Sequence, residues 1–158
     1  MPSARKTVVA RCLSLAVVCL LLAAPARGAE AAAPAAAAED GITLLRQELA
    51  AKPAAPGYIR LGYLLIKKGN PDQALLAFDE AIRLNPRSHD ALCGKGIAQV
   101  RKGNLDTAEQ LFRDALTANP NPVRVHYELG LLYEKRGNID KALAEYKEGL
   151  KKYQEGRR

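Results

Sequence analysis

The feature that most constrains this chain is a set of residues that recurs every 34 positions. Gly62, Gly96 and Gly130 show this interval. It also relates four other sets, namely Gly69, Gly103 and Gly137; Asn70, Asn104 and Asn138; Ala74, Ala108 and Ala142; and the rings of Phe78, Phe112 and Tyr146. A repeat of this length is typical of a solenoid, in which each unit buries its apolar face against the next unit.

Each unit is predicted to hold two helices. In the first unit Leu61 and Leu65 are four residues apart, which places them on one helical face. Gly69 is expected to end this helix, because glycine tolerates the left-handed backbone of a C-terminal cap. Asn70 is then expected to cap the second helix, whose first residue is Pro71. The inner face of that second helix should consist of Ala74, Phe78 and Ala81, and Asn85-Pro86 should end it.

Residues 55–88, 89–122 and 123–156 resemble three units of the tetratricopeptide repeat (TPR) family. The first unit carries the family's pattern in Leu61-Gly62, Ala74, Phe78 and Pro86. The third unit departs from it, since Gly149 replaces an alanine and no proline follows. The resemblance implies an all-α fold: an α-solenoid of three helix-turn-helix units plus an N-terminal helix, wound as a right-handed superhelix.

The two ends of the repeat array differ. Residues 41–53 are predicted to form a capping helix or the second helix of a degenerate repeat, with Asp40 as its N-cap and Ile42, Leu45 and Leu49 along one side. No matching cap follows the last repeat, whose final helix carries Leu150 and Tyr153. A solenoid usually needs a polar terminal cap. We therefore expect this edge to be covered by a second copy, by a partner, or by the basic tail.

The first 26 residues have the layout of a secretory signal peptide. A positive start is followed by the uncharged stretch Cys12–Ala26, which ends in small residues, so cleavage is expected near Ala26 or Ala29. The alternative is an uncleaved membrane anchor, although a span needs about 20 apolar residues. Residues 27–40 are predicted to be an Ala/Pro-rich tether, disordered or partly helical. The chain is thus expected to be exported, to the periplasm or attached to the inner membrane.

The resemblance also implies a concave groove lined by the first helix of each unit. The residues at the corresponding positions are Ile59, Tyr63, Ile66, Lys67, Cys93, Ile97, Val100, Arg101, Arg124, Tyr127, Leu131 and Lys135. They predict an apolar floor with positive charges along one side, suited to a segment with apolar anchors and some acidic residues. The alternative is that these residues simply fill a tight superhelix or pack against the N-terminal tether.

Catalysis is not expected. The two histidines, His89 and His126, have no Cys, Asp or Glu at a spacing typical of a metal site or a triad. Cys93 is the only cysteine after the apolar stretch, and we interpret it as a buried structural residue. No cofactor is expected. The carboxylate clamp of chaperone-binding TPR proteins is absent, because only Arg124 among the corresponding residues could serve.

The net charge of +7 is concentrated near the two ends of the chain, so no nucleic-acid partner is expected. The functional hypothesis is a non-catalytic adaptor of the cell envelope that binds a peptide or protein segment in the groove and assists assembly of an envelope complex. The alternative is a self-assembling, homo-oligomeric scaffold that associates through its uncapped C-terminal helix. Contact with a membrane is expected only if the N-terminal segment is retained.

Overall fold

A computed structural model describes residues 33–118 and 122–157, with side chains from residue 41 onward. Seven helices follow one another in these residues and no strand occurs among them, so the all-α prediction is confirmed. The helices are α2 (Ala33–Ala51), α3 (Ala55–Lys67), α4 (Pro71–Leu84), α5 (His89–Lys102), α6 (Leu105–Ala118), α7 (Val123–Lys135) and α8 (Ile139–Glu155). The chain divides into two compact units, Met1–Ala37 and Ala38–Arg158, and these helices belong to the second unit apart from the first residues of α2.

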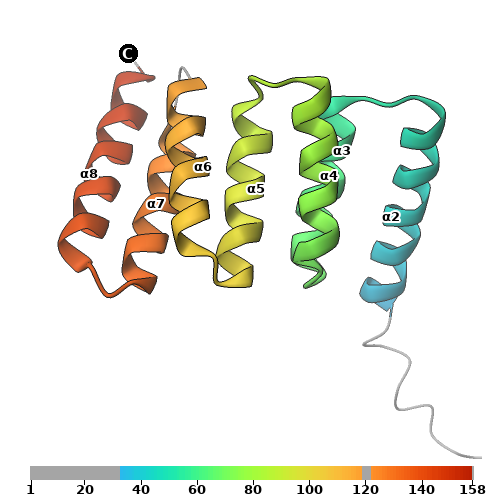
Figure 1. Cartoon of the computed structure of the whole chain (residues 1–158), viewed down its shortest axis with the longest axis horizontal. Coiled ribbons are helices and arrows are strands. Elements are labelled where there is room, and N and C mark those ends of the chain that lie inside the picture. Colours follow the sequence, from blue (N-terminus) through green and yellow to red (C-terminus); the bar gives the residue numbers. More distant parts are fainter. Residues whose placement is uncertain (1–32, 119–121, 158) are drawn as a thin grey trace, which may run out of the picture. The chain divides into compact units, whose positions relative to one another are not determined.

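Six of the helices form three hairpins, α3–α4, α5–α6 and α7–α8, which stand side by side (Figure 1). The second helix of one hairpin packs on the first helix of the next, since α4 contacts α5 and α6 contacts α7. The first helices also contact each other directly, α3 with α5 and α5 with α7. These three helices therefore line one side of the stack, where the sequence predicts the groove.

Each hairpin turns at a glycine with a left-handed backbone. Gly69, Gly103 and Gly137 have φ angles of 79°, 87° and 74°. Residues with a Cβ are strained in this region, which explains why glycine stands at all three turns. At the first turn the amide of Asn70 donates to the carbonyl of Leu65 at 2.9 Å, satisfying an acceptor that the helix end leaves open. The predicted end of each first helix is confirmed.

The predicted capping of the second helices is only partly correct. The side chain of Asn138 accepts a hydrogen bond from the amide of Lys141 at 3.2 Å, as expected of an N-cap. Asn70 occupies the N-cap position of α4, but its side chain makes no capping hydrogen bond. Pro71 follows it and has no amide hydrogen, so the start of α4 leaves one donor fewer to satisfy.

Helix α2 begins earlier than the sequence analysis placed it. It starts at Ala33, inside the segment assigned to the tether, so Asp40 lies within the helix and does not cap it. Alanine has the highest helix propensity of all residues, which accounts for the extension through this alanine-rich segment. From residue 41 onward the expected face forms, because Ile42, Leu45 and Leu49 are all buried.

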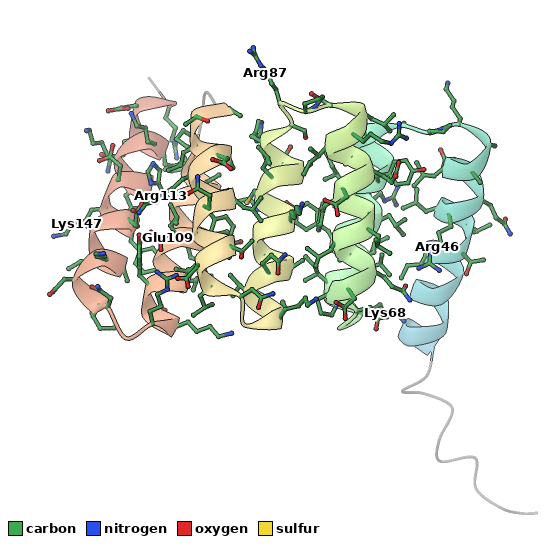
Figure 2. The ribbon with its side chains drawn as sticks, in the orientation of Figure 1. Arg46, Lys68, Arg87, Glu109, Arg113 and Lys147 are labelled. Carbon is green, nitrogen blue, oxygen red and sulfur yellow. The ribbon has the colours of Figure 1, made fainter. Side chains whose placement is uncertain are left out.

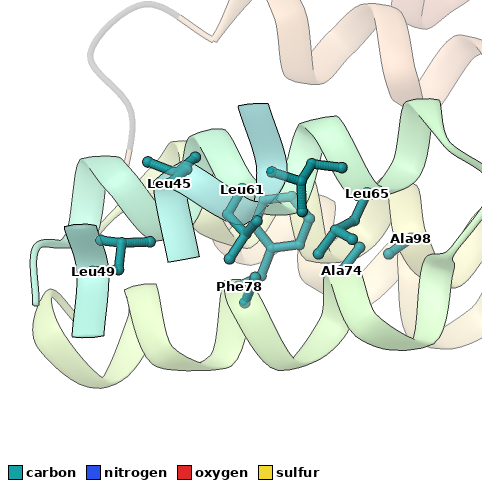
Figure 3. Close-up of a cluster of buried hydrophobic side chains, with 9 residues drawn as sticks. Leu45, Leu49, Leu61, Leu65, Ala74, Phe78 and Ala98 are labelled. Carbon is teal, nitrogen blue, oxygen red and sulfur yellow. The ribbon is translucent and has the colours of Figure 1, made fainter. Parts of the chain in front are cut away.

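The first core cluster is centred on the fully buried ring of Phe78. The cluster comprises nine buried side chains from α2, α3, α4 and α5, most of which are labelled in Figure 3. The ring lies between the backbones of α3 and α5, where Cβ atoms added to Gly62 and Gly94 would come within 2.5 and 2.2 Å of its carbons. Close approach of both helices therefore requires glycine on each side. Phe78 thereby fastens the first repeat to the second.

The junction between the second and third repeats combines a buried ring with polar contacts. Phe112 packs on Gly96 of its own hairpin, but the third repeat has Glu128 at the position corresponding to Gly94. Polar contacts supplement the packing here. The Tyr133 hydroxyl donates to Glu109 at 2.8 Å, and the guanidinium groups of Arg113 and Arg136 also bind this carboxylate, which is labelled with Arg113 in Figure 2. Charged and apolar contacts together hold α6 and α7 against each other.

His126 is part of the core of the third hairpin. It is 9% exposed, and its Nδ1 lies 2.8 Å from the carboxylate of Glu145 on α8. Gly149 allows α8 to approach, since an added Cβ would lie 3.2 Å from the Cβ of His126. Burial and the contact with Glu145 give His126 a structural role in this hairpin.

Within the described residues, no helix combines the length and the apolar character needed to cross a bilayer. The predicted signal peptide, residues 1–26, lies outside the described residues. So does the first part of the predicted tether, up to residue 32.

Candidate functional site

Five of the twelve predicted groove residues meet in one pocket between α5 and α7, which we call the central pocket. It has a volume of about 250 Å³. It is lined by Ile97, Val100, Arg101, Glu128, Leu131, Leu132 and Lys135. The apolar members of this set come from two neighbouring first helices, Ile97 and Val100 from α5 and Leu131 and Leu132 from α7. A side chain of another protein that entered this pocket would contact two repeats at once.

The structure brings only part of the predicted row of positive charges to the central pocket. Lys135 donates from its Nζ to the carbonyl of Val100 at 3.1 Å, so it is held at the C-terminal end of α5. Lys67 is exposed and does not line this pocket. Arg101 and Arg124 lie close enough to Glu128 to lower its pKa in part. The cationic side of the pocket therefore consists of Arg101 and Lys135, with Arg124 nearby.

Glu128 is a residue of this pocket that the sequence analysis did not select. Burial raises the pKa of its carboxyl group, and the two nearby arginines offset only part of that rise. One sequence signal could have identified it. Glu128 follows Arg124 by four residues, and the same helical face continues with Leu131 and Lys135.

Tyr63 and Arg124 contact each other across the predicted groove. The guanidinium carbon of Arg124, in α7, lies 4.5 Å from the ring centroid of Tyr63, in α3, which is a cation–π distance. Tyr63 is also edge-on to Phe78, with ring centroids 5.3 Å apart, and its hydroxyl donates to the carbonyl of Asp90 at 3.2 Å. Burial raises the pKa of this hydroxyl. The pair therefore joins the first and third repeats.

Cys93 does not lie on the groove surface, and its assignment as a groove-lining residue is corrected. Its side chain is 1% exposed and belongs to the second core cluster with Phe112, Val125 and Leu129. Burial raises the pKa of the thiol to about 12. The next repeat packs over this face of α5, so the position has become part of the core.

The remaining predicted residues are distributed over other surfaces. Ile59 lines a hollow of about 350 Å³ near the start of α5. Ile66 packs against the first core cluster. Tyr127 lies in a third pocket, at the outer edge of α7 and α8, with its ring centroid 5.8 Å from that of Tyr146.

No group of three or more His, Cys, Asp or Glu side chains able to hold a metal ion lies together in the part of the chain that the structure describes. His89 lies 3.5 Å from the carboxylate of the adjacent Asp90 on an exposed surface. The central pocket offers apolar contact and fixed charges, which suit binding.

Comparisons with known proteins agree with this geometry. A family model described as Tetratricopeptide repeat matches residues 59–121 and 93–157. No curated protein matched the chain. Among solved structures, one titled "Crystal structure of MamA" is 26% identical, with a TM-score of 0.66, and the match covers 76% of this chain and 71% of that one.

Two further solved structures have the same fold. TTC0263, a thermophilic TPR protein of Thermus thermophilus, is 24% identical, with a TM-score of 0.68, and the match covers 77% of this chain and 68% of that one. YrrB, titled as a TPR protein with an unusual peptide-binding site, is 22% identical with a TM-score of 0.63. The match with YrrB covers 77% of this chain and 63% of that one.

Proposed function

Because this chain belongs to the tetratricopeptide repeat family of protein-interaction scaffolds, we propose that it is a non-catalytic adaptor that binds a segment of another protein in the central pocket. The observation that carries the proposal is the meeting of Ile97, Val100 and Leu131 in one pocket of about 250 Å³ between two repeats. An apolar side chain that fills such a pocket loses its contact with water, which supplies binding energy.

The charged residues at the central pocket indicate which polar group the ligand should carry. Arg101 and Lys135 flank the apolar floor, and Arg124 lies close enough to Glu128 to lower the pKa of its carboxyl group in part. A ligand with one apolar anchor and a carboxylate close to it in sequence would satisfy both parts of the site. Glu128 disfavours a second acidic residue deep in the pocket, so the carboxylate of the ligand should lie at the rim.

A photoreactive amino acid at position 97 tests where ligands bind. We expect crosslinked adducts in cells from position 97, and none from position 84. Leu84 is the matched control, because it is 38% exposed, as Leu131 is, but lies on a second helix. The substitution Leu131→Glu should abolish the adducts while the circular dichroism spectrum stays unchanged. Equal crosslinking from both positions would refute the proposed site.

Peptide display against the purified chain tests the chemistry of the ligand. Selected peptides should share an apolar residue with Asp or Glu within about four positions of it, and Ile97→Glu should abolish their binding. A selection that yields basic peptides, or peptides whose binding survives Ile97→Glu, would contradict the proposal.

We further propose that this adaptor works outside the cytoplasm, where it assists assembly of an envelope complex. The support is the order of basic, apolar and small residues within positions 1–26. Fusion of alkaline phosphatase after residue 158 should give an active enzyme, because that reporter folds only after export. N-terminal sequencing of the same material would distinguish cleavage near Ala26 or Ala29 from a retained anchor. An inactive fusion would exclude export.

A further inference from the structure

An apolar row is exposed along the outer side of α8. It consists of Ile139, Leu143, Tyr146, Leu150 and Tyr153, which are spaced by four, three, four and three residues. Tyr146, at the centre of the row, is partly buried against the second core cluster, and the other four residues are exposed. Ile139 and Leu150 are each 62% exposed, Leu143 is 51% and Tyr153 is 50% exposed. This spacing averages 3.5 residues, which is the repeat of a helix that pairs with another helix over several turns.

The corresponding rows of the other two hairpins are covered. In α4, Leu75 and Phe78 pack in the first core cluster against the neighbouring helices, and Phe78 is 0% exposed. In α6, Leu116 is partly buried and Phe112 is fully buried in the second cluster. The next hairpin packs on each of these helices, because α4 contacts α5 and α6 contacts α7. The row on α8 therefore has the apolar character of the α4 interface, and it differs from the α6 interface in having Leu143 where α6 has Glu109.

We propose that this row binds α8 of a second copy of the chain, so that two copies associate through antiparallel α8 helices. A two-fold arrangement satisfies both exposed rows at once, because each is the partner of the other. The occupant must be a helix with apolar residues at the same spacing. α8 of another copy of the chain is such a helix.

Charged residues on α8 favour one alignment of the two α8 helices. Asp140 and Lys147 lie one heptad apart on the flank of the row that faces away from α7, and Lys147 extends away from the stack of hairpins in Figure 2. Both are exposed, and no ion pair joins either of them to another described residue. In an antiparallel pair, Asp140 can meet Lys147 of the second copy, and the symmetry creates this contact twice.

The same register matches the apolar residues. It places Leu143 opposite Tyr146 of the second copy, and Leu150 opposite Ile139 of the second copy. Leu150 borders a pocket of about 280 Å³ that is formed with Tyr127, Tyr146 and Tyr153, and that we call the C-terminal pocket. Ile139 of the second copy therefore lies at the mouth of this pocket. An aliphatic side chain suits it, because the lining consists mainly of rings and apolar atoms.

This inference is independent of the proposed ligand site. The central pocket is lined by residues of α5 and α7, whereas the row lies on α8, so substitutions can separate the two. A partner protein that covered the row in place of a second copy would leave the purified chain monomeric. Such a result would refute the proposal.

Sedimentation equilibrium of the purified full chain provides the test. We expect the mass of a dimer at micromolar concentration, and a monomer for Leu150→Glu with an unchanged circular dichroism spectrum. Leu44→Glu is the matched control, because Leu44 is 65% exposed on α2 and should leave the dimer intact. A monomer of the unsubstituted chain at several hundred micromolar, or a dimer of Leu150→Glu, would overturn the proposal.

Charge reversal tests the register and distinguishes pairing from a structural effect. Asp140→Lys and Lys147→Asp should each weaken association about tenfold, because each reverses two surface ion pairs. The double variant should return to within about threefold of the unsubstituted chain. If association of the double variant is as weak as that of either single variant, the antiparallel register is wrong.

Discussion

Replacement of Gly94 by alanine is expected to destabilise the fold, although alanine is the better helix former. An added Cβ would lie 2.2, 2.4 and 2.9 Å from three ring carbons of Phe78. The ring cannot move away, because it is 0% exposed and Gly62 holds its other face. Overpacking of this kind costs about 1–3 kcal/mol, and the gain in helix propensity returns about 1 kcal/mol. The free energy of unfolding should therefore fall by up to about 2 kcal/mol.

Urea titration followed by far-ultraviolet circular dichroism measures this change. Gly41→Ala is the control, since Gly41 lies inside α2 with nothing within 4 Å of an added Cβ, and it should gain up to about 1 kcal/mol. Combining Gly94→Ala with Phe78→Leu should cost less than the sum of the two single changes, because the smaller side chain relieves the clash. If Gly94→Ala gains stability to the same extent as Gly41→Ala, the ring of Phe78 does not limit the approach of α5.

Three further results are expected. Glu145→Ala should cost about 1–3 kcal/mol in a urea titration, because it leaves Nδ1 of His126 buried without its partner at 2.8 Å, whereas the exposed Glu148→Ala should cost under about 0.5 kcal/mol. Burial raises the pKa of Glu128. At a pH between the unfolded-state and the folded-state pKa, the folded chain therefore holds a proton that the unfolded chain has released. The free energy of unfolding should fall as the pH rises above the ordinary glutamate pKa of about 4.3, and Glu128→Gln should remove that loss. The urea midpoints of the unsubstituted chain and of Glu128→Gln should therefore coincide at low pH and diverge at higher pH. Burial raises the pKa of Cys93 to about 12, so peptide mapping after iodoacetamide treatment at neutral pH should show modification at least about a hundredfold slower in the folded chain than in urea.

The sequence predicted those parts of the fold that depend on local chemistry. The glycine at each hairpin turn, the buried faces around Phe78 and Phe112, and the apolar side of α2 follow from spacing and backbone preference, and all of them are present. The sequence allowed a partly helical tether, but Asp40 was interpreted as a helix cap, whereas it lies inside α2. The helix propensity of the preceding alanines extends the helix through that position.

The site was less predictable, because it depends on how tightly the hairpins curve. Family positions identified the first-helix residues, but no local pattern shows that Arg124 reaches Tyr63, which is 61 residues earlier in the chain. The burial of Cys93 and the raised pKa of Glu128 arise from the same packing. Spacing in a sequence determines which face a residue occupies. It does not determine how far that face lies from a repeat two units away.

The contact between Arg124 and Tyr63 has a consequence for how the chain unfolds. In most solenoids each repeat touches only its neighbours, so an end can fray while the remainder stays folded. Here the last hairpin is also fastened to the first one by a guanidinium that lies 4.5 Å from an aromatic ring centroid. Opening of α7 from its neighbours must release this contact as well. The three hairpins should therefore unfold more cooperatively than repeats that contact only their neighbours.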